Sequence, residues 1–194
     1  MTLGRRLILA SGSPRRRELL TELGVDFEVG TVEVHELEGD SARGFSPGEL
    51  ARENARRKAA AAAERWPGRL VLGADTVVAL EGRFFGKPDS PEEARDFLRE
   101  LSGRTHEVTT GCVLVDTSGE TEVFHETTQV TFRVLSEETI ARYLADVQVL
   151  DKAGGYALQE RGEWIVERVE GSRSNVIGLP VEALARVLRK RGLL

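Results

Sequence analysis

Two long segments rich in threonine and valine, residues 105–116 and 121–135, most constrain the fold that this chain can adopt. A short turn sequence, TSGE, separates them, and β-branched residues favour extended strands, so we expect one long antiparallel hairpin. Helical patterns and further strand-like segments surround this hairpin. The sequence therefore predicts an α/β fold with a mixed β-sheet and flanking helices, rather than a doubly wound parallel sheet.

Five segments carry the start signals of helices. A Ser-Pro pair opens three of them, with serine as the cap and proline in the first turn. Glu93 is expected to complete a capping box with Ser90. The predicted helices cover residues 13–24, 46–66, 90–103, 136–147 and a final segment from Pro180.

The remaining segments alternate between strands and loops. Further strands are expected over residues 6–10, 25–34, 69–73 and 163–169, and a second hairpin should turn at Glu81-Gly82. Loops are expected over residues 35–48, 151–162 and 170–175. No internal repeat or low-complexity linker interrupts the sequence, so we expect a single domain over residues 1–194.

The composition excludes several classes of protein. The net charge of −5 offers no general attraction to nucleic acid or to an anionic membrane, so we expect neither as a partner. The single cysteine, Cys112, excludes an intrachain disulfide and a cysteine-rich zinc site. The apolar run LILA at residues 7–10 is too short for a signal peptide or a membrane span, which favours a cytoplasmic location.

The motif GADTVV at residues 73–78 places a carboxylate and a hydroxyl, Asp75 and Thr76, in an otherwise apolar stretch. A buried carboxylate needs hydrogen bonds, a cation or a metal, because desolvating it alone costs several kcal/mol. Lys87 follows in the motif GKP, on a turn where its ammonium could serve a phosphate at the same cleft. Read alone, GKP is more typical of an exposed turn lysine.

The motif SGSPRRRELL predicts a helix N-terminus with three arginines, Arg15, Arg16 and Arg17, in its first turn. Cations are unfavourable there for the helix itself, so the pattern indicates a nearby anion such as a triphosphate. The alternative is a solvated basic turn that pairs with Glu18 and Glu22.

Two later loops combine glycine with polar residues. DKAGGYALQ at residues 151–159 supplies a charge at Lys152 and, at Gln159, an amide that could read a base edge. GSRSNVIGLP at residues 171–180 leads into the last helix. Each loop alone is also consistent with simple turn chemistry.

Competing chemistries lack the necessary residues. Cys112 lies in an apolar strand without a histidine partner, and the three histidines, His35, His106 and His125, show no metal-binding spacing. Neither a GxGxxG nor a GxxxxGK[ST] motif is present. The remaining carboxylates, lysines and arginines are typical of Mg²⁺-assisted phosphate hydrolysis.

Taken together, six motifs in order give the chain a specific resemblance. LILASGSPRRRELL, GADTVV, GKP, LSGRTHEV, DKAGGYALQ and EGSRSNVIGLP closely resemble the Maf family of nucleoside triphosphate pyrophosphatases, also called septum formation proteins, from about residue 7 to 185. The resemblance implies an ITPase-like fold of two lobes around a central cleft. It also implies cleavage between the α- and β-phosphates, release of pyrophosphate, and a homodimer.

The resemblance also assigns roles to single residues. It makes Asp75 the catalytic acidic residue, buried at a strand end where it activates water, alone or through a metal. It also makes Glu36, with Asp75, a ligand of a divalent cation, Mg²⁺ or Mn²⁺, with Glu33 and His35 as neighbouring alternatives. The helix cation maps to Lys58; a rival register would place Asn54 there, which we reject because a phosphate partner should be a cation. The expected substrate-binding residues are Ser11, Ser13, Arg15, Arg16, Lys58, Lys87 and Lys152.

Three positions separate branches of the family. Arg15, Thr76 and Gln159 resemble the branch that prefers dTTP and UTP, whereas the 7-methyl-GTP branch has an acidic residue in place of the glutamine. Arg173 departs from the aromatic residue common at its position. Two alternatives stay open: a pyrophosphatase for 7-methyl-GTP or for other modified or purine triphosphates, and a regulator of septum formation that acts through binding.

Overall fold

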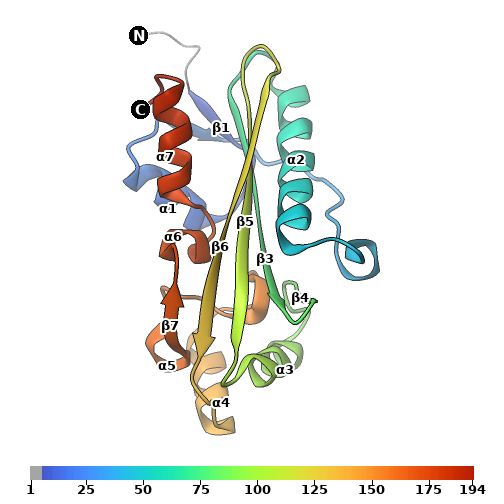
Figure 1. Ribbon diagram of the computed structural model, residues 1–194, viewed down its shortest axis with the longest axis vertical. Helices are drawn as coiled ribbons and strands as arrows, with labels where there is room; N and C mark the ends of the chain where they lie inside the picture. Colours follow the sequence, from blue (N-terminus) through green and yellow to red (C-terminus); the bar gives the residue numbers. More distant parts are fainter. Residues whose placement is uncertain (1–5) are drawn as a thin grey trace.

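The computed structural model describes residues 6–194, so residues 1–5 of the predicted domain lie outside the described part. Its centre is a seven-stranded mixed sheet (Figure 1) in the order β2-β1-β3-β5-β6-β7, with β4 paired to β3. β1 pairs in parallel with β2 and β3, and the other pairs are antiparallel, which confirms the predicted mixed sheet. The strands are β1 (Leu7–Leu9), β2 (Phe27–Val29), β3 (Val71–Leu80), β4 (Arg83–Phe85), β5 (Thr105–Val115), β6 (Thr121–Phe132) and β7 (Val166–Glu170).

Helices flank the sheet at all five predicted places. The serine caps at residues 13, 46, 90 and 136 each accept a hydrogen bond from the backbone N–H three residues later. The α-helices are α1 (Pro14–Glu22), α2 (Pro47–Arg65), α3 (Pro91–Leu101), α4 (Glu137–Asp146), α5 (Gly162–Ile165), α6 (Arg173–Ile177) and α7 (Val181–Lys190). Two short 3₁₀ helices, η1 (Gly39–Ala42) and η2 (Ala153–Gly155), interrupt loops.

The upper part of the molecule has three layers. Alternate residues of a strand point to opposite faces, so one face of β1 and β3 contributes Leu9 and Leu72 to a core with α1 and α7. The other face contributes Ile8 and Val71 to a core with α2. In Figure 1, α7 and α2 accordingly lie on opposite sides of the strands.

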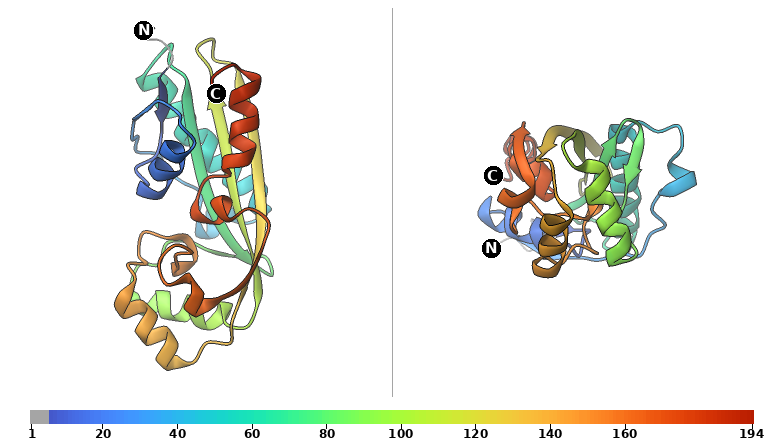
Figure 2. Two further views of the ribbon diagram at one scale, coloured as in Figure 1. Left: turned by 90° about the vertical axis from the view of Figure 1, so that its left-hand side faces the viewer. Right: turned by 90° about the horizontal axis from the view of Figure 1, so that it is seen from below.

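The lower part has a separate hydrophobic core. There the ends of β3, β5 and β6 pack with α3, α4, η2 and α5, around large buried side chains such as Phe85, Phe132 and Tyr143. Figure 2 shows these helices grouped beneath the upper layers. The molecule therefore has two lobes that share the long central strands, as the resemblance implied.

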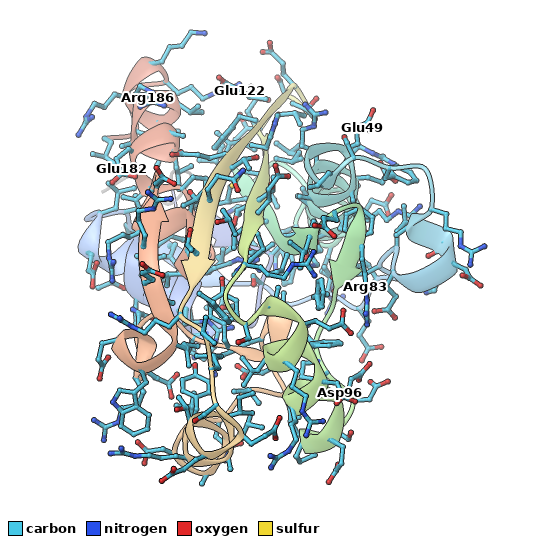
Figure 3. The ribbon with its side chains drawn as sticks, turned by 60° about the horizontal axis from the view of Figure 1, so that its bottom comes forward. Glu49, Arg83, Asp96, Glu122, Glu182 and Arg186 are labelled. Carbon is cyan, nitrogen blue, oxygen red and sulfur yellow. The ribbon has the colours of Figure 1, made fainter. Side chains whose placement is uncertain are left out.

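Charged side chains cover the outside of both lobes. In Figure 3, Glu182 and Arg186 on α7 and Asp96 on α3 are examples of exposed charges, and both signs occur on α7.

One edge of β3 is open between two partners. β1 pairs with β3 only at Val71 and Leu72, and β4 pairs only with residues 78–80. In the described part of the chain no strand covers residues 73–77 on that side, whereas β5 follows the other edge from Val71 to Ala79. The GADTV sequence therefore lies at a gap in the sheet, where side chains from both faces can reach one cleft.

Several local expectations were wrong. Residues 69–73 do not form a separate short strand: β3 is continuous from Val71 to Leu80, so Asp75 lies in the middle of a strand and not at its end. β2 covers only three of the ten residues predicted at 25–34. The first part of the strand expected at 163–169 is α5, and the loop expected at 170–175 overlaps α6.

Helix caps also differ from expectation in two places. The Glu93 carboxylate accepts a hydrogen bond from the backbone N–H of Asp89 (2.7 Å) and not from that of Ser90, so the predicted capping box is incomplete. Pro180 caps α7 from outside the helix, which begins at Val181. Short segments of this kind depend on tertiary contacts more than on local sequence.

Candidate active site

A cleft of about 430 Å³ lies between the two lobes, at the gap beside β3. Its walls come from the loop after β1 and the start of α1, from β3, from residues 151–159 and from α6. The structure brings together every site residue that the sequence selected: Ser11, Ser13, Arg15, Arg16, Glu36, Lys58, Asp75, Thr76, Lys87, Lys152 and Gln159.

Asp75 is buried, and its carboxylate meets two side chains from α2. The Lys58 ammonium Nζ lies 2.7 Å from Oδ1, and the Asn54 amide Nδ2 donates to Oδ2 over 3.2 Å. Asn54 and Lys58 are four residues apart, so they lie on the same helical face. The buried carboxylate thus has both the cation and the hydrogen bond that its desolvation requires.

Glu36 completes an acid–base cluster around Lys58. The ammonium Nζ lies 2.9 Å from the Glu36 carboxylate Oε2, so one lysine bridges two carboxylates. Burial opposes ionisation of Glu36, but the charge of Lys58, followed by that of Lys87, outweighs it and holds the pKa of Glu36 below its usual value. Glu33 and His35 are exposed and do not line the cleft, which favours Glu36 as the partner of Asp75.

Arg16 points into the protein and supports the turn between β1 and α1. Its guanidinium donates to the Gly178 carbonyl (2.8 Å), to Ser11 Oγ (3.0 Å) and to Thr76 Oγ1 (3.0 Å). Burial lowers the pKa of Arg16, and no carboxylate pairs with it within residues 6–194. A buried guanidinium without an anionic partner leaves positive charge beside the cleft.

Arg15 and Lys152 lie on opposite walls of the cleft and share one carboxylate. Asp151 Oδ2 lies 3.0 Å from Arg15, and its Oδ1 lies 2.8 Å from the Lys152 ammonium. Burial opposes ionisation of Asp151, but hydrogen bonds from the two cations keep its pKa below the usual value. Lys152 also contacts Glu160 (3.5 Å), so much of its charge is already neutralised.

None of the three arginines forms the predicted alternative pair. In the described part of the chain, no ion pair joins them to Glu18 or Glu22. Arg17 is exposed and lies away from the cleft, on an outer groove next to Pro14. The helix therefore contributes two of its three arginines to the candidate site.

The loop that carries Gln159 is fixed by buried hydrogen bonds. The Tyr143 hydroxyl accepts from the Ala157 N–H (2.9 Å) and donates to the Ala157 carbonyl (3.2 Å). His106 Nε2 and the Tyr156 hydroxyl are 2.9 Å apart, which gives the LSGRTHEV motif a contact with this loop. Gln159 itself is exposed at the rim of the cleft.

Other chemistries are not supported by the residues that the structure describes. Burial raises the pKa of Cys112 to about 12, so this thiol is not a poised nucleophile. Within residues 6–194, no three His, Cys, Asp or Glu side chains cluster as a complete metal site. The same range contains no helix long and apolar enough to cross a membrane.

Sequence reasoning rejected one residue that the structure places at the site. Asn54 was set aside as a competitor of Lys58, but both contact Asp75. Their spacing of four residues on one long predicted helix is the signal that favours both, because it places them on the same helical face.

Two lobes around a central cleft, built on a mixed sheet with flanking helices, define a Ham1-like α/β fold. The fold is similar to the Ham1 protein of Staphylococcus aureus (TM-score 0.56, 19% identity, 96% of this chain and 99% of that one). It is equally similar to a HAM1 protein from Coxiella burnetii (TM-score 0.56, 16% identity, 95% and 98% covered).

The chain belongs to the family of Maf-like proteins, whose model matches residues 6–191. Curated relatives include proteins of Bacillus cereus (strain ZK / E33L) and Bacillus anthracis, each named dTTP/UTP pyrophosphatase. Each is 45% identical to this chain over 186 residues, which cover 96% of this chain and 95% of the relative.

Proposed function

We propose that this protein hydrolyses dTTP and UTP between the α- and β-phosphates, giving the nucleoside monophosphate and pyrophosphate. The observation that carries the proposal is the partly buried Asp75–Lys58–Glu36 cluster in a cleft lined by further cations. The names of the 45% identical relatives support the same reaction and the same substrates.

The cleft suits a triphosphate. Arg15, Arg16 and Lys87 line it with positive charge, and the N-terminus of α1 adds the partial charge of its free N–H groups. On binding, the triphosphate competes with Asp151 for Arg15, while Arg16 stays in its buried position. Lys87, which is exposed, is free to follow the leaving pyrophosphate.

The carboxylate pair fits a divalent cation. Mg²⁺ and Mn²⁺ take oxygen ligands, and Mg²⁺ is commonly held by one or two carboxylates together with substrate phosphates. Asp75 and Glu36, both within 3 Å of the same lysine nitrogen, are the residues that would hold it. When bound, the cation would neutralise charge on the phosphates.

In the proposed reaction, Asp75 accepts a proton from the attacking water. The water oxygen bonds to the α-phosphorus, and the bond from that phosphorus to the bridging oxygen breaks. Pyrophosphate leaves with the electron pair, and Lys58, Lys87 and Arg15 offset the charge that develops on it.

Base selection is assigned to the rim of the cleft near Gln159. Uracil and thymine present two carbonyl acceptors around the N3–H donor. A glutamine amide can donate to one of the carbonyls through its NH₂ group and accept from N3–H through its oxygen. A carboxylate at this position would repel those oxygens. Thr76 contributes indirectly, because its hydroxyl accepts a hydrogen bond from Arg16.

A panel of triphosphates, assayed for pyrophosphate release with Mg²⁺ or Mn²⁺, tests the proposal. We expect dTTP and UTP to be hydrolysed well ahead of dATP, GTP and 7-methyl-GTP, and Gln159→Glu to reduce that preference. A panel led by 7-methyl-GTP would refute the base assignment and leave the pyrophosphatase activity standing. A role in septum formation through binding alone would instead leave the cellular effect of Asp75→Asn equal to that of the wild type.

The proposal includes a cytoplasmic homodimer without nucleic acid or membrane partners. The family resemblance supports the dimer, the single buried Cys112 suits a reducing compartment, and the net charge of −5 disfavours polyanionic partners. Light scattering of the purified protein measures the oligomeric state directly.

A further inference from the structure

Asn54 is a buried residue whose amide links Asp75 to the backbone of Leu37. It is 3% exposed. Its Nδ2 donates to Asp75 Oδ2 (3.2 Å) and to the carbonyl of Leu37 (3.1 Å), and its Oδ1 accepts from the N–H of Leu37 (2.7 Å). The Asn54 side chain therefore binds the N–H and the carbonyl of Leu37 as well as the Asp75 carboxylate.

Leu37 directly follows Glu36, in a segment without regular secondary structure between β2 and η1. Three residues of α2 bind this segment in succession. Arg57 donates to the carbonyl of His35 (3.0 Å), Lys58 binds the side chain of Glu36 (2.9 Å), and Asn54 binds Leu37. The position of Glu36 is therefore fixed by one face of α2, which binds both of its neighbours, His35 and Leu37.

We propose that Asn54 is a positioning residue that fixes the Asp75 and Glu36 carboxylates relative to each other. This inference rests on the proposed function, in which these carboxylates hold a divalent cation and Asp75 accepts a proton. Lys58 supplies charge to both carboxylates through a long, flexible side chain, whereas the short planar amide of Asn54 sets their geometry. Hydrogen-bond partners of metal-ligating carboxylates commonly have this orienting role.

The position of Asn54 also predicts which kinetic constant it controls. Asn54 does not line the cleft that contains Arg15 and Gln159. It lines a second cavity of about 810 Å³, which meets the first at Glu36, Asp75, Thr76 and Lys87. The amide thus approaches Asp75 without touching the substrate-binding residues, so its loss should lower kcat with little change in KM for dTTP.

The test compares Asn54→Ala with Asn54→Leu, which removes the same hydrogen bonds but keeps most of the side-chain volume. Ala62→Gly is the matched control, because Ala62 is buried on the same helix, one turn beyond Lys58, and glycine destabilises a helix without touching the site. For each protein, kcat and KM for dTTP, Mn²⁺ affinity by titration, and thermal unfolding are measured.

Both Asn54 variants should lose 10- to 100-fold in kcat and in Mn²⁺ affinity, the range of about 10- to 100-fold found when such orienting partners are removed, with KM changed less than about threefold. Ala62→Gly should unfold at a lower temperature, with kcat and Mn²⁺ affinity within about twofold of the wild type. Equal behaviour of Ala and Leu at position 54 would assign the loss to hydrogen bonds and not to a cavity.

Wild-type kcat and Mn²⁺ affinity in a folded Asn54 variant would overturn the inference, and so would a change confined to KM. Loss of the fold in both variants would also overturn it, because Asn54 would then act on the fold alone. A wild-type protein that binds Mn²⁺ but hydrolyses no triphosphate would refute only the proposed function, and Mn²⁺ titration would then decide the role of Asn54. A wild-type protein that does neither refutes both.

Discussion

Asp75 and Thr76 are neighbours in β3, yet their side chains leave the sheet on opposite faces. Asp75 points to α2, where Lys58 and Asn54 meet its carboxylate. Thr76 points to the other face, where its hydroxyl accepts a hydrogen bond from Arg16. The two residues reach one cleft only because β3 has no partner strand beside them on one edge.

Asp75→Asn should nearly abolish turnover and leave the fold intact. The amide preserves the volume of the side chain but cannot accept the proton from water, and loss of a general base commonly costs several orders of magnitude in rate. Pyrophosphate release measured beside a circular dichroism spectrum checks both halves of the statement. Wild-type turnover in the folded variant would contradict the proposed role of Asp75 as the proton acceptor.

Replacement of Lys58 or Lys87 by alanine should weaken kcat/KM for dTTP by roughly 10- to 1000-fold, the scale of a lost charge-assisted contact of about 1.5–4 kcal/mol. Of the two, we expect Lys58→Ala to cost more, because it leaves two neighbouring carboxylates without their shared cation. Steady-state kinetics of both variants compares them. Unchanged kinetics for Lys58→Ala would show that its contact with Asp75 has no catalytic role.

At the scale of elements, the packing of α2 on the sheet decides whether its side chains reach Asp75. A Cβ atom on Gly73 would clash with the backbone of α2 at Ala55, and one on Gly111 would clash with it at Ala51. Glycine in the strands and alanine in the helix thus permit an unusually close approach. This approach lets a side chain as short as that of Asn54 bond to a carboxylate in the strand.

Gly73→Ala should therefore lower both stability and activity. Forcing a methyl group against the α2 backbone is expected to cost about 1–3 kcal/mol and to shift Asn54 and Lys58 away from Asp75. A shift on this scale should reduce kcat by about 10- to 100-fold. Gly86→Ala is the matched stability control, because a Cβ there meets open space. Equal unfolding free energies for the two variants would contradict the close packing.

At the scale of the whole molecule, the long central strands join the cores of the upper part to the separate core of the lower part, and the cleft lies between the two parts. His106 is a polar residue buried in the lower core, with 1% of its surface exposed. Its ring packs edge-to-face against Phe132 and lies within hydrogen-bond distance of the Tyr156 hydroxyl. Burial lowers the pKa of His106 from 6.5 to about 4. The imidazole is thus neutral in the fold over most of the pH range.

This buried histidine should make the fold sensitive to acid. Its folded-state pKa lies below the unfolded value, so its contribution to stability is fully present above about pH 6.5 and is lost as the pH falls to about 4. Between pH 7 and pH 4, the wild type should lose about 2–3 kcal/mol more unfolding free energy than His106→Gln, which cannot titrate. Urea unfolding at several pH values measures the difference. A difference between the two proteins that does not change with pH would contradict a neutral, buried His106.

Sequence alone determined the features whose signals are local. Serine caps, proline in first turns and a long Thr/Val hairpin specified the major helices and the mixed sheet, because these signals act within a few residues. Ordered motifs indicated the family, and the site residues selected from them line one cleft, with Arg17 as the exception among the three arginines of α1. The short elements α5, α6 and β2 were predicted wrongly or too long, because their conformation depends on partners distant in the chain.

Tertiary structure alone decided how the selected residues divide their contacts. Sequence spacing could not show that Asp151 contacts Arg15 as well as its neighbour Lys152, or that Arg16 is buried against Gly178. The Arg15–Asp151 and Arg16–Gly178 contacts join residues that are 136 and 162 positions apart in the chain. It also could not show that Asn54 and Lys58 share Asp75. That sharing depends on how closely α2 packs on the sheet. The close packing is possible because Gly73 and Gly111 have no side chain facing the helix, and no local sequence signal shows which helix they face.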